Sequence, residues 1–179
     1  NFIFPEENKN MDLTVKFYVN DGYEVPEIQV DPPVNFDSPE YQDMIENSLV
    51  STGNNYRLKK VIEKCKRGED VTIAYIGGSI TQGAGGKPIN TMCYAYRSYD
   101  AFCKLFSPCD GKNMHYVKAG VGGTPSELGM VRYDLDVTKN GEITPELVVV
   151  EFAVNDEGDE TQGVSFESLV MKILQAENA

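Results

Sequence analysis

The 179-residue sequence contains a single histidine, His115, and no two cysteines in a CxxC arrangement. Zinc sites are built from closely spaced cysteines and histidines, so four scattered cysteines and one histidine do not supply one. No apolar run approaches the roughly 20 residues of a membrane-spanning helix. The N-terminus lacks the basic flank and long apolar stretch of a signal peptide, but a leader can be removed, so the compartment stays undetermined.

Basic side chains are also scarce: 16 Lys and Arg stand against 28 Asp and Glu, for a formal net charge of −12. Such a charge repels nucleic acid and anionic membranes, and we expect neither as a partner. It is compatible with a neutral or cationic small substrate, although an acidic surface also simply keeps a protein soluble. The apolar fraction of 41% is that of an ordinary globular domain.

The four cysteines favour free, buried thiols and hence, slightly, a reducing, cytoplasmic compartment over secretion. Cys93 and Cys103 fall in one expected helix, ten residues apart, which is too far for a mutual disulfide. Cys103 and Cys109 are close enough in sequence to bridge. The remaining cysteine is Cys65.

The chain divides into an N-terminal β arm over residues 1–38 and a main domain over 39–179. In the arm, apolar and polar residues alternate over 13–19, as in a half-buried strand, and Asn-Asp-Gly follows as a turn. In the main domain, strands and helices alternate, which predicts a parallel α/β sheet with helices on both faces. We expect helices over 39–67 (interrupted at 51–54), 92–106, 127–137 and 166–175, with Ser165 as the last N-cap, and strands over 71–76, 115–117 and 147–153.

Each predicted strand is followed by residues that suit acyl transfer. Ser79 follows the first strand in a glycine-rich loop, a second glycine block covers 119–124, and Asn155 follows the third strand. In open α/β sheets the carboxyl ends of the strands are where ligands bind. A hydroxyl that attacks a carbonyl, with preorganised N–H donors for the oxyanion, is the equipment of a serine esterase.

Other loop motifs fail at specific positions. The P-loop pattern has Thr81 in place of its first Gly and Pro88 in place of Ser/Thr, and both GxGxxG candidates have proline at the third Gly. The α/β-hydrolase elbow GxSxG has Thr81 as its last residue. A segment from Asp136 imitates a calcium loop but has Leu147 at position twelve, so a plain Asn-Gly turn is the better interpretation. A phosphate- or nucleotide-binding domain is therefore disfavoured.

The three blocks, in order, resemble those of the SGNH/GDSL hydrolases. Residues 77–81 (GGSIT) resemble the GDS(L/I) block, 119–124 the glycine block and 152–156 (FAVND) the GxND block. The segment 53–58 leading into IAYIGGSITQG is most similar to bacterial carbohydrate esterases of this family, many of which remove acetyl groups. The resemblance covers residues 70–179 and implies a flavodoxin-like three-layer α/β/α fold, with no cofactor and no metal.

The resemblance implies a role for each matched residue. Ser79 would be the nucleophile, with its own N–H as an oxyanion donor, and Gly123 and Asn155 would provide two further donors. Asp156 would hold the loop. The residues expected to line the substrate are Gly78, Gly122 and Thr124.

The sequence departs from the family pattern in several places. The family's aspartate, asparagine and glycine are replaced by Gly78, Lys118 and Ala153. The histidine of the terminal DxxH motif is absent, and His115 is expected at the far end of the second strand. We therefore expect a truncated, by itself nearly inactive part of an esterase, completed by a missing C-terminal segment or a partner chain, and acting on an acylated carbohydrate or small ester. The alternative is a non-catalytic carbohydrate-binding protein of the same fold. Tyr94, Tyr96 and Tyr99 could stack on a sugar, but their helical spacing fits core packing as well.

Overall fold

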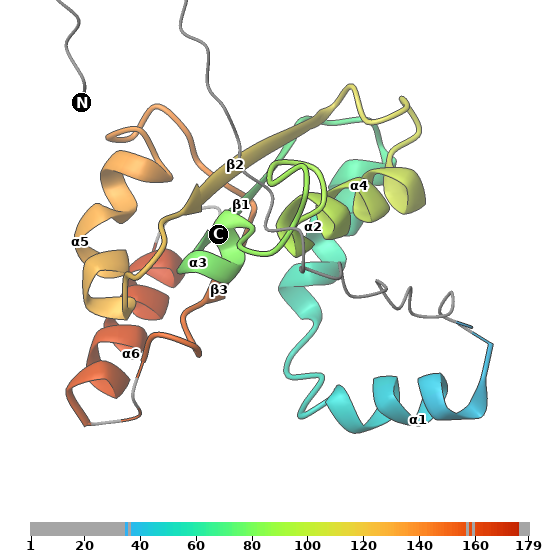
Figure 1. Cartoon of the computed structure of the whole chain (residues 1–179). Coiled ribbons are helices and arrows are strands. Elements are labelled where there is room, and N and C mark those ends of the chain that lie inside the picture. The colour runs from blue at the N-terminus through green and yellow to red at the C-terminus, as the bar shows by residue number, and fades with distance from the viewer. Residues whose placement is uncertain (1–34, 36, 157, 159, 176–179) are drawn as a thin grey trace, which may run out of the picture. The chain divides into compact units, whose positions relative to one another are not determined.

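Residues 35, 37–156, 158 and 160–175 are described by the computed structural model (Figure 1). The chain divides into two compact units between Val50 and Ser51. The described part of the first unit contains the helix α1 (Pro39–Ser48), where the Tyr41 N–H donates to the Ser38 hydroxyl at 3.2 Å. The predicted β arm lies almost wholly outside the described residues, and the domain boundary near residue 38 stays a prediction.

The second unit is built on a parallel sheet of three strands, β1 (Val71–Gly77), β2 (Met114–Gly120) and β3 (Leu147–Glu151). Their order is β2-β1-β3, and both pairs are parallel. The β-branched and apolar run of β1 suits its central place, because such a strand is covered on both faces. The register sets Gly77 beside both Gly120 and Glu151, so the carboxyl ends of all three strands lie level at one edge.

Helices cover both faces of this sheet, as Figure 1 shows. On one face α2 (Tyr56–Lys66) and α4 (Tyr94–Phe106) pack against Ile73 and Tyr75. On the other, α5 (Ser126–Asp136) and α6 (Glu160–Gln175) pack against Ala74 and Ile76. Successive strand residues point to opposite faces, which is why one strand serves both layers. The predicted three-layer α/β/α arrangement is confirmed.

Two elements differ from the prediction by more than two residues. β2 spans seven residues instead of three, because it pairs with β1 along its whole length although Lys118 interrupts its apolar pattern. The last helix begins at Glu160, so Ser165 lies inside it and is not its N-cap. Gly163 and the neighbouring hydroxyl residues are weak helix formers, so the sequence pattern did not indicate a helix start before them. Burial of Leu169 and Ile173 in the core stabilises the whole helix despite these residues.

All four cysteines are free. Cys65 and Cys93 are buried, Cys103 is partly buried and Cys109 is exposed, so the expectation of buried thiols is wrong for Cys109. The disulfide considered between Cys103 and Cys109 is not formed.

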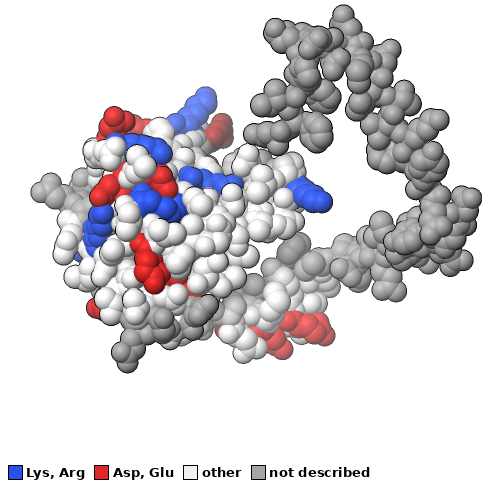
Figure 2. Space-filling view, turned by 60° about the vertical axis from the view of Figure 1, so that its left-hand side comes forward, with Lys and Arg blue, Asp and Glu red and all other residues white. Residues whose placement is uncertain are grey.

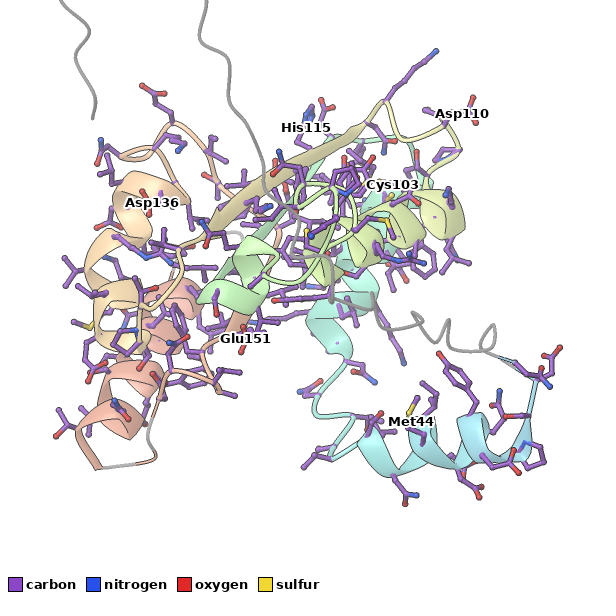
Figure 3. The ribbon with its side chains drawn as sticks, in the orientation of Figure 1. Met44, Cys103, Asp110, His115, Asp136 and Glu151 are labelled. Atoms are coloured by element: carbon purple, nitrogen blue, oxygen red, sulfur yellow. The ribbon has the colours of Figure 1, made fainter. Side chains whose placement is uncertain are left out.

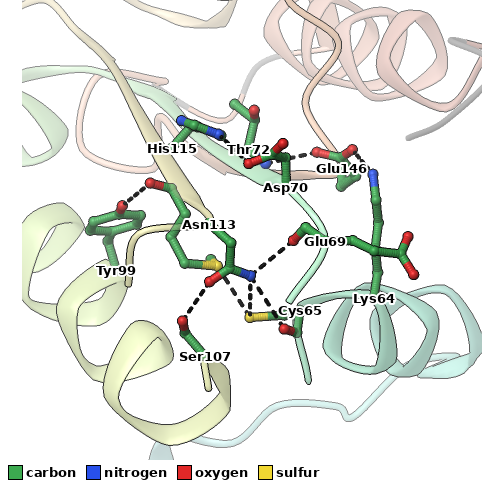
Figure 4. A network of polar contacts seen from close by, with 11 residues as sticks. Lys64, Cys65, Glu69, Asp70, Thr72, Tyr99, Ser107, Asn113, His115 and Glu146 are labelled. Carbon is green, nitrogen blue, oxygen red and sulfur yellow. Dashed lines mark hydrogen bonds and ion pairs between the residues drawn. The ribbon is translucent and has the colours of Figure 1, made fainter. Parts of the chain in front are cut away.

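A polar network joins α2, α4 and the amino ends of the strands (Figure 4). The buried Asn113 amide donates to the carbonyls of Glu69 at 2.9 Å and Cys65 at 3.3 Å, while the Ser107 hydroxyl donates to Asn113 Oδ1. Glu146 pairs with Lys64 and accepts the Thr72 N–H at 2.7 Å. Buried polar groups are costly unless paired, so this network fixes the end of the sheet opposite the glycine-rich loops.

The surface carries both signs of charge. On the face in Figure 2, blue and red side chains are interspersed among the described residues, with no broad basic area. Within the described ranges, no helix is both long and apolar enough to cross a bilayer.

Candidate active site

The three predicted loops meet at the carboxyl edge of the sheet. The Val121 N–H donates to the Gly77 carbonyl at 3.1 Å, which joins the loop after β2 to the end of β1. The Gly78 N–H donates to the Glu151 carbonyl at 3.2 Å, which joins the loop after β1 to the end of β3. These bonds extend the ladder of the sheet by one step, so the loops start from fixed backbone positions.

Ser79 is the first residue of α3 (Ser79–Gln82), a helix of a single turn. The Gln82 and Gly83 N–H groups close this turn on the carbonyls of Gly78 and Ser79, at 3.0 and 2.9 Å. Ser79 itself is partly exposed. Among the described residues, neither its hydroxyl nor its N–H has a hydrogen-bond partner, so both remain available to a ligand.

Asn155 lies directly against Gly78. A β-carbon built on Gly78 would fall 2.3 Å from Asn155 Oδ1 and 3.3 Å from its Cγ. Any larger residue at position 78 would therefore displace the amide, which gives a packing reason for glycine where the SGNH pattern has aspartate. The Asn155 N–H donates to Phe152 O at 2.9 Å, but its side-chain amide has no partner within the described part of the chain.

The glycine block after β2 reaches the same place. A β-carbon on Gly122 would lie 3.7 Å from the Ser79 β-carbon, so the two residues are neighbours. The Gly122 N–H, however, already donates to Gln82 Oε1 at 3.0 Å. Gly123 has a φ of +74°, a conformation that side chains disfavour. Its N–H has no hydrogen-bond partner among the residues that the structure describes, in contrast to that of Gly122.

The other predicted residues of these loops serve the loops themselves. Thr124 is buried, and its hydroxyl donates to the Val121 carbonyl at 2.7 Å. Asp156 accepts the N–H of the fully buried Ser126 at 2.8 Å, which ties the loop after β3 to the start of α5. This contact caps an otherwise unsatisfied helix N–H, a common task for an aspartate.

Two groups of polar contacts beneath the loops were not predicted from the sequence. Arg132 on α5 donates through Nη2 to the Gly77 carbonyl at 2.9 Å and through Nη1 to Asp136 at 2.7 Å, with only 14% of its side chain exposed. On the opposite face, the Thr81 hydroxyl lies 2.9 Å from the Tyr94 hydroxyl and 3.2 Å from Glu151 Oε2. The sequence contains one signal for these contacts, which is a charged residue next to buried apolar residues. Glu151 follows a run of valines, and Arg132 precedes the buried Tyr133.

Each of the three loops has an exposed apolar residue next to its candidate site residue. Ile80 follows Ser79, Val121 precedes the glycine pair and Val154 precedes Asn155; their exposed fractions are 41%, 42% and 67%. These side chains give the carboxyl edge an apolar component next to its polar groups.

His115 lies at the other end of the sheet (Figure 3). It pairs in register with Thr72, five residues before the level of Gly77 and Gly120. At roughly 3.3 Å per strand residue this is about 16 Å from the loops. Its Nε2 lies 3.0 Å from Asp70 Oδ1 in an exposed hydrogen bond. His115 is therefore not placed to activate Ser79.

The three tyrosines considered for sugar stacking are packed against the core. Tyr94, Tyr96 and Tyr99 pack against the core cluster on the α4 face, as their helical spacing indicated. No cluster of three or more potential metal ligands occurs among the described residues.

Comparison with solved structures identifies esterases as neighbours. A crystal structure of a two-domain esterase (CEX) active on acetylated mannans, co-crystallised with mannopentaose, matches with a TM-score of 0.65 and 36% identity over 74% of this chain. A second structure of a two-domain esterase of that description matches with a TM-score of 0.62 and 38% identity over 72%. The chain spans about a third of the length of these proteins, 35% and 33%. No family model matches the sequence, and no curated protein shows significant similarity to it.

The described second unit therefore has the α/β/α fold of these esterases in part, with a three-stranded parallel sheet between helical layers.

Proposed function

We propose that this polypeptide is the nucleophile-bearing part of an SGNH-type serine esterase that hydrolyses acyl esters, in particular acetyl esters of a carbohydrate. The main support is the position of Ser79: its unpaired hydroxyl lies where three loops meet, in a chain whose structural neighbours are esterases. Two further unpaired donors, the Gly123 N–H and the Asn155 amide, belong to the other two loops.

In the proposed reaction, Ser79 Oγ attacks the ester carbonyl and its proton passes to a general base. The carbonyl oxygen becomes an oxyanion, which the N–H groups of Ser79 and Gly123 and the side-chain amide of Asn155 would stabilise. Collapse of the tetrahedral intermediate breaks the bond to the alcohol, which leaves with a proton. Water then attacks the acyl-serine, releases the carboxylic acid and regenerates the hydroxyl.

The general base of this proposal lies outside the described residues. His115 is at the far end of the sheet and is occupied by Asp70. We propose that a histidine in a DxxH segment of a longer polypeptide, or of a partner chain, completes the site. Without it the 179 residues would retain only the oxyanion donors, and the rate would fall by several orders of magnitude.

An acetylated carbohydrate is the proposed substrate because both neighbours are described as active on acetylated mannans. A neutral sugar is also compatible with the net charge of −12, which would repel a polyanion.

The test compares the 179-residue chain with a polypeptide extended through a DxxH segment, called here the extended polypeptide. Each is treated with a fluorophosphonate probe and with an activated acetyl ester. We expect the extended polypeptide to be labelled at Ser79 and to hydrolyse the ester, and the 179-residue chain to be nearly inactive. Ser79→Ala is the control and should abolish both signals. Labelling at another residue, or no labelling of the extended polypeptide, would contradict the proposal.

The remote position of His115 favours one alternative, a non-catalytic carbohydrate-binding protein of the same fold. Calorimetric titration with a mannooligosaccharide separates the two. Binding by an extended polypeptide that neither hydrolyses esters nor reacts with the probe would support the alternative.

A further inference from the structure

Building on the proposed function, we propose that Thr81 is a positioning residue that fixes the Ser79 turn through a partly buried hydrogen-bond chain from Tyr94 to Glu151. These hydrogen bonds link α4, α3 and the end of β3 on the face of the sheet that α4 covers. Glu151, at the end of β3, is labelled in Figure 3.

The Ser79 turn needs such an anchor because α3 contains only four residues. A helix of one turn does not persist by itself, since its few hydrogen bonds do not offset the entropy of ordering the backbone. Of the four side chains, Thr81 alone is buried, with an exposed fraction of zero. Gln82, which is exposed, accepts the Gly122 N–H through Oε1 at the surface of the loops, so Thr81 provides the anchor of the turn on the core side.

The direction of the hydrogen bonds follows from the groups present. A carboxylate only accepts, so the Thr81 hydroxyl donates its proton to Glu151 Oε2. The Tyr94 hydroxyl must then be the donor to Thr81 Oγ1, at 2.9 Å. A tyrosine phenol is protonated at neutral pH, and burial raises the pKa of Tyr94 further. Each bond in such a chain polarises the next, so the chain is stronger than two isolated bonds.

Two glycines bring the turn onto the strand ends. A β-carbon on Gly77 would lie 2.1 Å from Thr81 Oγ1, and one on Gly120 would lie 2.2 Å from the Gln82 backbone nitrogen. Neither position has room for a side chain, so α3 is in direct contact with the ends of β1 and β2. Thr81 thus holds the turn at a place where it packs directly on the strand backbone, with no side chain between them.

The first experiment measures amide hydrogen exchange in the 179-residue chain. The N–H groups of Gln82, Gly83 and Ala84 close the turn, and their protection reports on it. Thr81→Val keeps the shape of the side chain but removes both bonds and leaves the Glu151 carboxylate without its donor. We expect the protection of these three amides to fall about 10-fold or more, and Thr81→Ser to restore most of it.

Tyr75→Phe is the matched control. It also removes a phenol hydroxyl in the same core cluster, which lies 2.9 Å from Ser98 Oγ and is not bonded to α3. The Tyr75 ring lies edge-on to the Tyr94 ring, with centroids 6.1 Å apart, and phenylalanine keeps this ring contact. Tyr94→Phe should lower the protection of the turn and Tyr75→Phe should not. Unchanged protection in Thr81→Val, or an equal loss in Tyr75→Phe, would overturn the proposal.

The second experiment measures kinetics on the extended polypeptide. A displacement of about 1 Å at a reacting group costs on the order of 100-fold in rate, so Thr81→Val should lower kcat by about 10-fold to 100-fold with little change in KM. Thr81→Ser should stay within a few-fold of the unmodified protein. An extended polypeptide with no esterase activity would contradict the proposed function, while the exchange result would still decide whether Thr81 positions the turn.

Discussion

The side chain of Asn155 fills the space beside Gly78: a β-carbon added to Gly78 would lie 2.3 Å from Asn155 Oδ1. The loop that presents Ser79 and the loop that presents Asn155 are thus in van der Waals contact. Changes at Gly78 should consequently act through Asn155.

Gly78→Ala should destabilise the protein and lower ester hydrolysis by the extended polypeptide. The added methyl must displace the Asn155 amide, and overpacking of this kind costs about 1–3 kcal/mol. Gly163→Ala is the matched control, because Gly163 lies within α6 with open space around it and alanine there should stabilise by roughly 0.5–1 kcal/mol. Denaturant unfolding and ester hydrolysis measure both effects. A stable, fully active Gly78→Ala variant would contradict the contact.

Asn155→Ala in the extended polypeptide should lower kcat by about 100-fold to 1,000-fold, the usual cost of one oxyanion donor. Asn155→Asp keeps the shape but sets a carboxylate where the oxyanion develops, and it should lower kcat at least as much. KM should change little, since the donor acts mainly in the transition state. A loss confined to KM would instead assign Asn155 to substrate binding.

Gly123→Ala and Gly141→Ala form a second matched pair. Both glycines have a positive φ, +74° and +95°, and open space around the missing β-carbon. Each substitution should cost about 1–2 kcal/mol of stability through backbone strain alone. Only Gly123→Ala should slow labelling of Ser79, because Gly141 belongs to the turn after α5. Equal effects of the two variants on labelling would count against an oxyanion role for Gly123.

Arg132→Met should lower the free energy of unfolding by about 1–3 kcal/mol, since it removes the bond to the Gly77 carbonyl and leaves Asp136 without its partner. Asp134 lies on the same helix as Arg132, and Asp134→Asn breaks its more exposed pair with Lys172 on α6, which should cost less than about 1 kcal/mol. Chemical denaturation of the two variants gives the difference. Similar values would show that burial of Arg132 adds nothing.

The 179-residue chain should self-associate in light scattering at increasing concentration, whereas the extended polypeptide should be monomeric. In the described part of the chain β3 pairs with β1 alone, so its other edge has unpaired backbone groups. A right-handed crossover through α6 would place a following strand at this edge. A monodisperse monomer of the shorter chain would contradict this expectation.

Much of the fold followed from short-range patterns. The β-branched runs of β1 and β3, the stop at Gly68 and the breaks around Gly53 located most elements, because a buried strand and a helix end each need particular residues. The start of α6 did not follow, since tertiary packing of Leu169 and Ile173 outweighs the weak helix formers near it.

The candidate site was predicted as three loops but not as contacts. Level strand ends made the meeting of Ser79, Gly123 and Asn155 an expectation of the topology. The bonds of Gln82 to Gly122, of Arg132 to Gly77 and of Thr81 to Tyr94 join residues 13 to 55 positions apart, for which the sequence contains no periodic signal. Gly122 was expected to face the substrate, and its bond to Gln82 shows that its N–H has a partner within the protein.

The close packing of α3 on two glycines, Gly77 and Gly120, also determines which positions of this sequence are free to vary. Gly77 and Gly120 admit no side chain, so substitutions there disturb the turn itself. Ile80, Val121 and Val154 have exposed side chains beside the same three loops. Divergence among relatives should therefore accumulate at these three positions, and under the proposed function selectivity for the acyl group or the sugar could change while the geometry around Ser79 is inherited.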